Sequence, residues 1–146
     1  MKSEAIVELG KPLQTIESET PEPKGKEVLL KITHSGVCHS DVHIHDGYFD
    51  LGGGNKLPVG QMLNLPHTMG HEIEGEVAAI GPDVTDVEIG ANVVAYPWIG
   101  CGECATCKAG DEHYCNAPRQ LGIQLPGGFA DYCIVPDSKY CLLYTS

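Results

Sequence analysis

The fold is decided around residues 70–80, which read GHEIEGEVAAI. Residues 73–80 of this stretch form a short, largely apolar segment of the length of one β-strand. Three further segments share this length and are rich in β-branched, aromatic or other apolar residues: 27–33, 92–96 and 129–135. Turn-forming residues separate them, since the chain contains 18 Gly and 10 Pro. Short strands divided by turns predict a mostly β protein, an antiparallel barrel or sandwich.

Helices have a minor place in this expectation. Residues 36–46 and 105–112 predict two short helices, and Gly47 suits the position that ends the first. Residues 51–65 are Gly-rich without clear periodicity, so we expect a long surface loop there. No strand is followed by a Gly-x-Gly-x-x-Gly turn and a helix, so these residues predict no dinucleotide-binding fold.

Size and charge exclude several classes of function. The 146 residues have the length of one domain, and 9 basic residues face 20 acidic ones. Without a basic cluster, nucleic acid is not expected as a partner. No apolar run approaches the roughly 20 residues of a membrane span, and no apolar signal core follows Met1. We therefore expect a soluble, cytoplasmic protein.

The cysteines are the first chemical signal, because seven are many for this length. Four of them are separated by two, two and seven residues: Cys101, Cys104, Cys107 and Cys115. Four thiolates can enclose one ion tetrahedrally and leave no open position, which predicts a structural zinc site. Iron or free thiols are the alternatives. A bacterial ferredoxin run begins with the same gaps, but its fourth cysteine comes after three residues.

A second set of metal-ligand types stands apart from this lobe. Cys38 and His71 are suitable zinc ligands and Glu72 is an additional candidate, so an open, catalytic site is conceivable. Taken singly, Cys38 is more typical of a small buried side chain, and His71 of a hydrogen-bonded histidine. The residues alone leave both interpretations open.

Three polar residues follow Cys38 closely. Asp41 can accept the second ring N–H of a ligating histidine and fix its tautomer. Ser40 and His43 are three apart, so both can line one side of a short helix. A hydroxyl and an imidazole on one face predict a path for a proton.

Together these motifs resemble the zinc-containing medium-chain alcohol dehydrogenases. The family's signature Gly-His-Glu-x-x-Gly matches residues 70–75, and its later small or β-branched positions match Gly81 and Val84. The cysteine gaps match the family's structural zinc lobe. Residues 126–132, PGGFADY, resemble a strand of the same family.

The resemblance implies a GroES-like antiparallel β-barrel with short helices and a zinc lobe over residues 1–140. It implies that Cys38 and His71 bind a catalytic zinc ion, with Glu72 as an alternate or transient ligand. Ser40 is implied to contact the substrate, and His43 to form the outer end of the proton relay. His39 is implied to contact the cofactor pyrophosphate, and Asp41 to support His71. Trp98 and Tyr48 are implied to line the substrate pocket. The alternative for Trp98 is an anchor in the core.

The implied reaction is oxidation of primary or secondary alcohols to aldehydes or ketones by hydride transfer to NAD or NADP. It uses two zinc ions per chain, one catalytic and one structural. The resemblance places a third catalytic-zinc ligand and the Rossmann domain beyond Ser146. We therefore expect the full-length enzyme to be a homo-oligomer that acts on small-molecule alcohols, and this fragment alone to be inactive. The substrate and the choice between NAD and NADP are left open.

The end of the chain departs from the family. After Lys139 and Tyr140 the family continues with an apolar residue and Pro, whereas residues 141–146 read CLLYTS. We expect residues 141–146 to be a non-native tail and Cys141 not to be a metal ligand. Cys133 is expected in the core. The remaining loop histidines are expected to be solvated: His45, His67 and His113.

Two other functions compete with this interpretation. One is a zinc-stabilised binding module with the same barrel and no catalysis. The other keeps the enzyme class but changes the substrate to a polyol, a formaldehyde adduct or a quinone.

Overall fold

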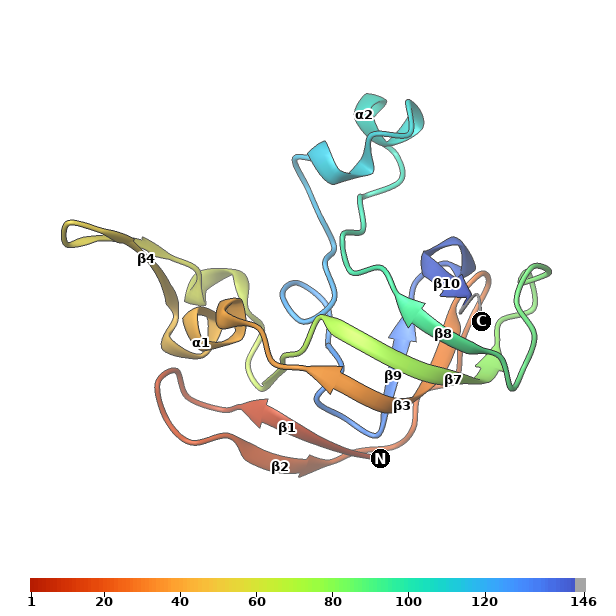
Figure 1. Ribbon diagram of the computed structural model, residues 1–146, viewed down its shortest axis with the longest axis horizontal. Coiled ribbons are helices and arrows are strands. Elements are labelled where there is room, and N and C mark those ends of the chain that lie inside the picture. Colours follow the sequence, from red (N-terminus) through yellow and green to blue (C-terminus); the bar gives the residue numbers. More distant parts are fainter. Residues whose placement is uncertain (144–146) are drawn as a thin grey trace.

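The computed structural model describes residues 1–143, and the chain folds as three antiparallel sheets with short helices between them (Figure 1). The strands are β1 (Lys2–Ile6), β2 (Gln14–Glu17), β3 (Val28–Gly36), β4 (Tyr48–Gly52), β5 (Asn55–Pro58), β6 (His67–Thr68), β7 (Glu72–Ile80), β8 (Asn92–Ala95), β9 (Tyr132–Val135) and β10 (Cys141–Leu143). The helices are α1 (His39–Asp46) and α2 (Ala105–Lys108), with 3₁₀ turns at Gly60–Met62, Glu112–Tyr114 and Ser138–Tyr140. The expected mostly β fold is confirmed.

The largest sheet has five strands in the order β10-β8-β7-β3-β9. Its inner face carries the main hydrophobic core, where alternate residues of β3 and β7 such as Leu30, Ile73 and Val77 are almost fully buried. This is the period-two pattern expected of a strand with one covered face. The four strands predicted from the sequence all lie in this sheet.

The ladder between β3 and β7 contains two irregularities. Leu29 pairs with Ala79 and Leu30 with Val77, so one residue of β7 is left without a partner. Further along, the pairing jumps on the other strand, and Thr33 of β3 is the residue passed over. The Thr33 hydroxyl donates a hydrogen bond to the carbonyl of Glu74 at 3.2 Å. Each irregularity is a β-bulge, which inserts one residue into one strand.

A second sheet of three strands, β2-β1-β6, lies beside the first. A bridge between Ser3 and Ala130 and a hydrogen bond from the Glu4 amide to the Phe129 carbonyl at 2.8 Å connect β1 to the segment before β9. In residues 1–143 no continuous ladder joins the three sheets, so the expected barrel is not closed by strand pairing. The contacts between sheets are made by single bridges and by packing.

A smaller hydrophobic core joins helix α1 to the three-stranded sheet. Ile44 of α1 is fully buried against Ile6 and Met69. The helix begins after Cys38, whose backbone N–H donates to the side chain of Asp41 at 2.9 Å. It ends at Gly47, which has a φ of 82°. This left-handed residue is the common end of a helix, so the prediction for Gly47 is confirmed.

Residues 51–65 do not form the irregular loop that we expected. They contain the second half of a hairpin, β4 and β5, followed by a 3₁₀ turn. Three successive glycines make the hairpin turn with positive φ values of 81°, 60° and 83°: Gly52, Gly53 and Gly54. The Gly-rich composition was therefore the signal of a turn between strands. The hairpin extends away from the sheets beside α1 (Figure 1).

The cysteine-rich segment with α2 extends away from the sheets on another side of the molecule (Figure 1). The end of the described chain returns to the large sheet, where Cys141 pairs with Ala95 and is buried in the core. Residues 141–143 thus complete an edge strand, although the boundary at residue 140 and the non-native origin of the tail stay predictions. Residues 144–146 of that tail lie outside the described residues. Within the described part of the chain, no helix has the length and hydrophobicity needed to cross a membrane.

Candidate metal centres and substrate cavity

The four cysteines of the predicted structural site lie together in the α2 lobe. Their sulfur atoms are all within 4.8 Å of one another, and none forms a disulfide. The Sγ atoms of Cys101 and Cys107 are 3.9 Å apart, as are those of Cys104 and Cys115. A zinc ion with tetrahedral bonds of about 2.3 Å places its sulfurs about 3.8 Å apart. The spacing of the sulfurs therefore fits a zinc ion.

Backbone amides donate hydrogen bonds to three of these sulfurs. The Cys104 amide donates to Sγ of Cys101 at 3.3 Å, and the Cys107 amide donates to Sγ of Cys104 at 3.4 Å. The Cys101 amide donates to Sγ of Cys115 at 3.3 Å. The amides of Glu103 and Cys104 lower the pKa of Cys101 to about 6. Burial raises the pKa of Cys107 to about 12, so that thiol keeps its proton until a metal displaces it.

The α2 lobe is connected to the large sheet through the carboxylate of Glu112. This carboxylate accepts hydrogen bonds from the Tyr140 hydroxyl and, at 3.4 Å, from the Gly100 amide. It also forms an ion pair with Lys139. Lys139 and then Tyr140 lower the pKa of Glu112, so the group is a carboxylate at neutral pH. These contacts were not predicted from the sequence, because the partners are 27 and 28 residues apart.

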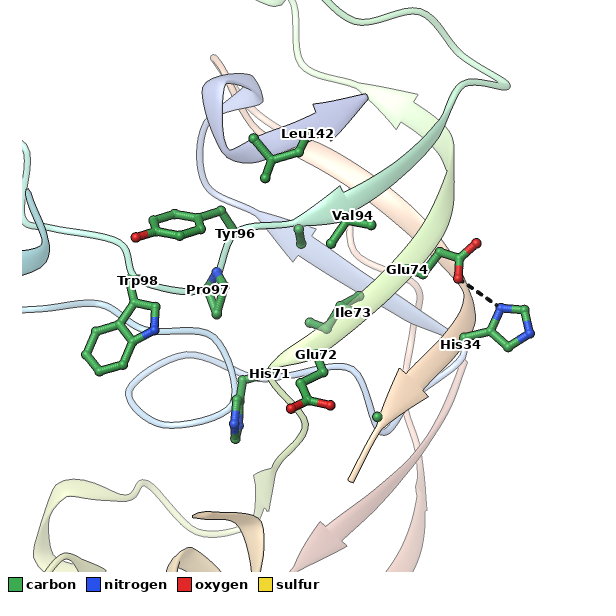
Figure 2. Close-up of a pocket in the computed structure, with 12 residues that line it drawn as sticks. His34, His71, Glu72, Ile73, Glu74, Val94, Tyr96, Pro97, Trp98 and Leu142 are labelled. Carbon is green, nitrogen blue, oxygen red and sulfur yellow. Dashed lines mark ion pairs between the residues drawn. The ribbon is translucent and has the colours of Figure 1, made fainter. Parts of the chain in front are cut away.

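The second candidate metal centre lies where β3 ends beside the start of β7. Cys38 follows β3, His71 precedes β7, and Glu72 is the first residue of β7. One ligand atom from each of these three residues lies within 4.8 Å of the other two. In Figure 2, the side chains of His71 and Glu72 extend in the same direction from the end of β7. The predicted ligand set is thus brought together, although 33 positions separate Cys38 from His71 in the sequence.

Asp41 supports both halves of this centre and is only 3% exposed. One carboxylate oxygen accepts from the Cys38 amide, and the other lies 3.4 Å from Nδ1 of His71 and 3.3 Å from the Gly70 amide. Nδ1 of His71 is buried and has no other partner among the described residues. A proton on Nδ1 directed at Asp41 leaves Nε2 free as a ligand atom. The donor set therefore fits a zinc ion.

The charges at this centre reinforce one another. The hydrogen bond with Asp41 is the main cause that raises the pKa of His71 to about 9. The amide and hydroxyl of Ser40, and then His71, lower the pKa of Cys38. Burial acts to raise the pKa of Asp41, but hydrogen bonds from His71 and Cys38 outweigh it and lower that pKa. Without metal, His71 is an imidazolium at neutral pH beside the Asp41 carboxylate, and a bound cation takes the place of a ring proton of that imidazolium.

Of the polar residues predicted to have a role in α1, Ser40 lies beside Cys38, and His39 and His43 lie beside each other. The Ser40 hydroxyl lies 3.6 Å from Sγ of Cys38. The rings of His39 and His43 are stacked with centroids 4.7 Å apart, and the His43 ring lies 4.8 Å from that of Phe49. His39 is exposed at the start of the helix.

A largely apolar cavity of about 230 Å³ opens beside His71. Its lining comes from α1, the hairpin and two loops: Ser40, Phe49, His71, Pro97, Trp98, Gln120, Leu121 and Ile123. Trp98 is 52% exposed, so it lines the cavity and is not an anchor in the core. Tyr48 is not part of this lining and instead places its ring 3.6 Å from the Lys56 ammonium. Phe49, the next residue, takes the place expected for Tyr48.

A wider cavity of about 570 Å³ is also lined by His71 (Figure 2). Trp98 and Tyr96 border it from the segment after β8, and Glu72 and Glu74 border it from β7. His71 and Trp98 line both cavities. The candidate metal centre therefore borders both the narrow apolar cavity and the wider one through His71.

Two expectations about single residues have clear outcomes. Cys133 is buried in the core, as predicted. His67 was expected to be solvated and is instead 4% exposed, with Nε2 2.9 Å from the Gly122 carbonyl. The expectation was wrong because β6 pairs with β1 and covers His67, and that pairing has no signal in a two-residue strand.

Comparisons with known proteins agree with this geometry. The family described as alcohol dehydrogenase GroES-like domain matches residues 24–145. An NAD-dependent alcohol dehydrogenase of Saccharolobus solfataricus is 45% identical over 141 residues, which are 96% of this chain and 40% of that protein. An L-threonine 3-dehydrogenase of Pectobacterium carotovorum is 36% identical over 83% of this chain and 33% of its own length.

Solved structures give the same result. A cobalt- and zinc-bound thermostable alcohol dehydrogenase from Pyrobaculum aerophilum superposes with a TM-score of 0.81 at 31% identity, over 100% of this chain and 42% of that one. The chain spans about 40% of the length of the dehydrogenases of S. solfataricus and P. aerophilum. The match covers both metal centres and the strands that position them. The chain belongs to the alcohol dehydrogenase GroES-like domain family, as part of the zinc-containing medium-chain alcohol dehydrogenases.

Proposed function

We propose that this chain is the catalytic domain of a zinc-dependent alcohol dehydrogenase that oxidises primary or secondary alcohols to aldehydes or ketones with NAD or NADP. The observation that carries the proposal is the meeting of Cys38, His71 and Glu72 at the mouth of an apolar cavity. A binding module without catalysis has no physical need for such a centre beside a cavity. Curated relatives that act as alcohol and threonine dehydrogenases support the class of reaction.

Two zinc ions belong to this proposal. Cys101, Cys104, Cys107 and Cys115 would hold a structural ion, because four sulfurs leave no position for a substrate. Cys38 and His71 would hold the catalytic ion with Glu72 as an exchangeable ligand. An ion bound there supplies Lewis acidity, which lowers the pKa of an alcohol hydroxyl.

The side chains of this domain position the alcohol and move its proton. The Ser40 hydroxyl shares the apolar cavity with His71, so it can accept the proton of a substrate hydroxyl held there. His43, half-buried three residues further along α1, is proposed as the group that passes this proton to solvent. His39, exposed at the helix start, is proposed to contact the cofactor pyrophosphate. Trp98 and Phe49 provide apolar contact for the substrate carbon chain.

The remaining features of the proposal concern the full-length enzyme. The domain reaches to residue 140, and the nicotinamide cofactor is bound mainly by residues outside this chain. The enzyme is proposed to be a cytoplasmic homo-oligomer, and this chain alone is proposed to lack dehydrogenase activity.

Metal analysis tests the two centres independently. The purified full-length enzyme is expected to contain two zinc ions per chain, its Cys38→Ser variant one, its Cys104→Ser variant one, and the double variant none. Cys133→Ala is the matched control, because Cys133 belongs to neither cluster, and it is expected to keep two. One zinc ion or none per chain in the unchanged full-length enzyme would contradict the two-site proposal. For the reaction, the full-length enzyme is expected to reduce NAD or NADP only when an alcohol is present, and Cys38→Ser is expected to abolish this.

A further inference from the structure

Gly36 stands directly opposite Glu72, as the last pair in the ladder between β3 and β7. The side chain of Glu72 does not extend along its own strand but folds across to the neighbouring one. A Cβ atom placed on Gly36 would lie 2.1 Å from Oε2 of Glu72, 3.0 Å from its Cβ and 3.1 Å from its Cδ. The carboxylate therefore occupies the volume that any other residue at position 36 would fill.

The backbone gives no reason for glycine at this position. Gly36 is absent from the residues with a positive φ, so an L-residue could adopt its conformation. The nearest three atoms to the missing Cβ all belong to Glu72, and none belongs to the backbone. Glycine at position 36 leaves space beside the strand, and the carboxylate of Glu72, a candidate metal ligand, occupies this space.

The path across Gly36 is also what brings Glu72 to the metal centre. Cys38 comes two residues after Gly36, on the continuation of the same strand. A carboxylate oxygen of Glu72 lies within 4.8 Å of the ligand atoms of Cys38 and His71 only because the side chain bends toward this strand. A methyl group at position 36 would displace that oxygen from the cluster.

We infer that Gly36 is a positioning residue for the catalytic metal centre: its lack of a side chain lets Glu72 reach the ligand set formed by Cys38 and His71. This inference rests on the proposed function of the centre. Because the clash falls mainly on the mobile end of a side chain, Gly36→Ala leaves the strands paired and moves the carboxylate. The change acts on metal binding through Glu72 and on nothing else in the centre.

A double-mutant cycle with zinc affinity as the readout tests this. Zinc affinity of the second centre is measured in the full-length enzyme by competition with a chelator. The four forms compared are the unchanged enzyme, Gly36→Ala, Glu72→Ala and the double variant, and the ion held by the four cysteines is the internal measure of folding. Gly36→Ala is expected to weaken the affinity by about 10- to 100-fold in the unchanged background. It is expected to have no effect in the Glu72→Ala background.

Gly60→Ala is the matched control. A Cβ at Gly60 would meet the end of the Leu9 side chain at 2.5 Å, so it also presses on a flexible group, but one outside both metal clusters. This variant is expected to bind both zinc ions as the unchanged chain does.

Each other outcome decides the question. Equal losses from Gly36→Ala with and without Glu72 would overturn the inference, and so would failure of both Gly36→Ala chains to fold. Failure of the single variant with folding restored in the double variant would support it. Absence of a second zinc ion from the unchanged full-length enzyme would overturn the proposed function itself, which is a separate result.

Discussion

The carboxylate of Asp41 contacts two residues of the candidate metal centre, Cys38 and His71. Its Oδ1 lies 3.4 Å from Nδ1 of His71, and its Oδ2 lies 2.9 Å from the Cys38 amide nitrogen. A single buried side chain thereby fixes the helix that follows Cys38 and the imidazole that precedes β7. Loss of a group that holds a metal-binding histidine in this way typically weakens metal affinity by about 10- to 100-fold.

Asp41→Asn is expected to weaken zinc binding at this centre by about 10- to 100-fold, because an amide has a single oxygen with which to accept from Cys38 and His71. The measurement is chelator competition, and zinc retained by the four cysteines shows that the variant is folded. Asp46→Asn, at the exposed end of the same helix, is the matched control. Unchanged zinc affinity in Asp41→Asn would contradict the support that we assign to Asp41.

The connection between the α2 lobe and the large sheet predicts an unequal effect of two neighbouring residues. Tyr140→Phe removes a hydroxyl from a largely buried carboxylate, so the free energy of unfolding should fall by about 1.5–3 kcal/mol. Lys139→Ala removes an ion-pair partner that is 50% exposed, and the expected loss is at most about 1 kcal/mol. Urea denaturation of the zinc-loaded chain measures both. A larger loss in Lys139→Ala would reverse the assigned order.

His67 predicts a stability that depends on pH. Burial lowers its pKa in the folded chain, against about 6.5 in the unfolded chain. Between these two pKa values the unfolded chain binds more protons, so stability rises with pH and is lost as pH falls below about 6.5. His67→Gln removes this contribution.

Nuclear magnetic resonance of the His67 ring, followed as pH falls, measures its pKa directly. Urea denaturation at pH values on both sides of 6.5 should give a smaller acid loss in His67→Gln than in the unchanged chain. The Cys101 thiol, with a pKa of about 6, titrates in the same range, so the test is the difference in acid-induced loss of stability between the two chains. A pKa of His67 above the ordinary value would contradict the prediction.

Trp98 predicts a preference among alcohols in the full-length enzyme, given the proposed function. Trp98→Ala enlarges the apolar cavity beside His71, and kcat/KM for an aromatic alcohol should fall by about 10-fold or more. Ethanol, which reaches little of this surface, should lose less. Tyr114→Ala, an exposed aromatic residue of the α2 lobe, is the control. Equal losses for both alcohols in Trp98→Ala would place Trp98 outside the substrate contacts.

The sequence predicted the large sheet because its strands alternate strongly. In β7, Ile73 and Val77 are buried at an even spacing, and so are Val93 and Ala95 in β8, as a strand with one buried face requires. Strand β2 has no fully buried residue, so it carries no such pattern and was not predicted. The hairpin of β4 and β5 was missed for the same reason, since β5 is exposed throughout.

The two metal centres differ in how far sequence alone could define them. The four cysteines fall within 15 residues, so spacing alone indicates one cluster. Cys38 and His71 are 33 positions apart, and only the pairing of β3 with β7 shows that they meet. The resemblance to a family named both residues, but the register of the sheet explains why they are neighbours. The contacts of Glu112 with Tyr140 had no such signal.

The two bulges between β3 and β7 lie on opposite strands, so the offset from one cancels the offset from the other. Val28 pairs with Ile80 and Gly36 with Glu72, and both strands have nine residues between these ends. Loss of either bulge alone would shift every later pair by one position and turn Glu72 to the opposite face of the sheet. The position of the carboxylate therefore depends on a pair of compensating irregularities, one between Leu29 and Leu30 and one between Ile32 and His34. A single insertion or deletion between the ends of the ladder would move Glu72 away from Gly36 unless a second change restored the register.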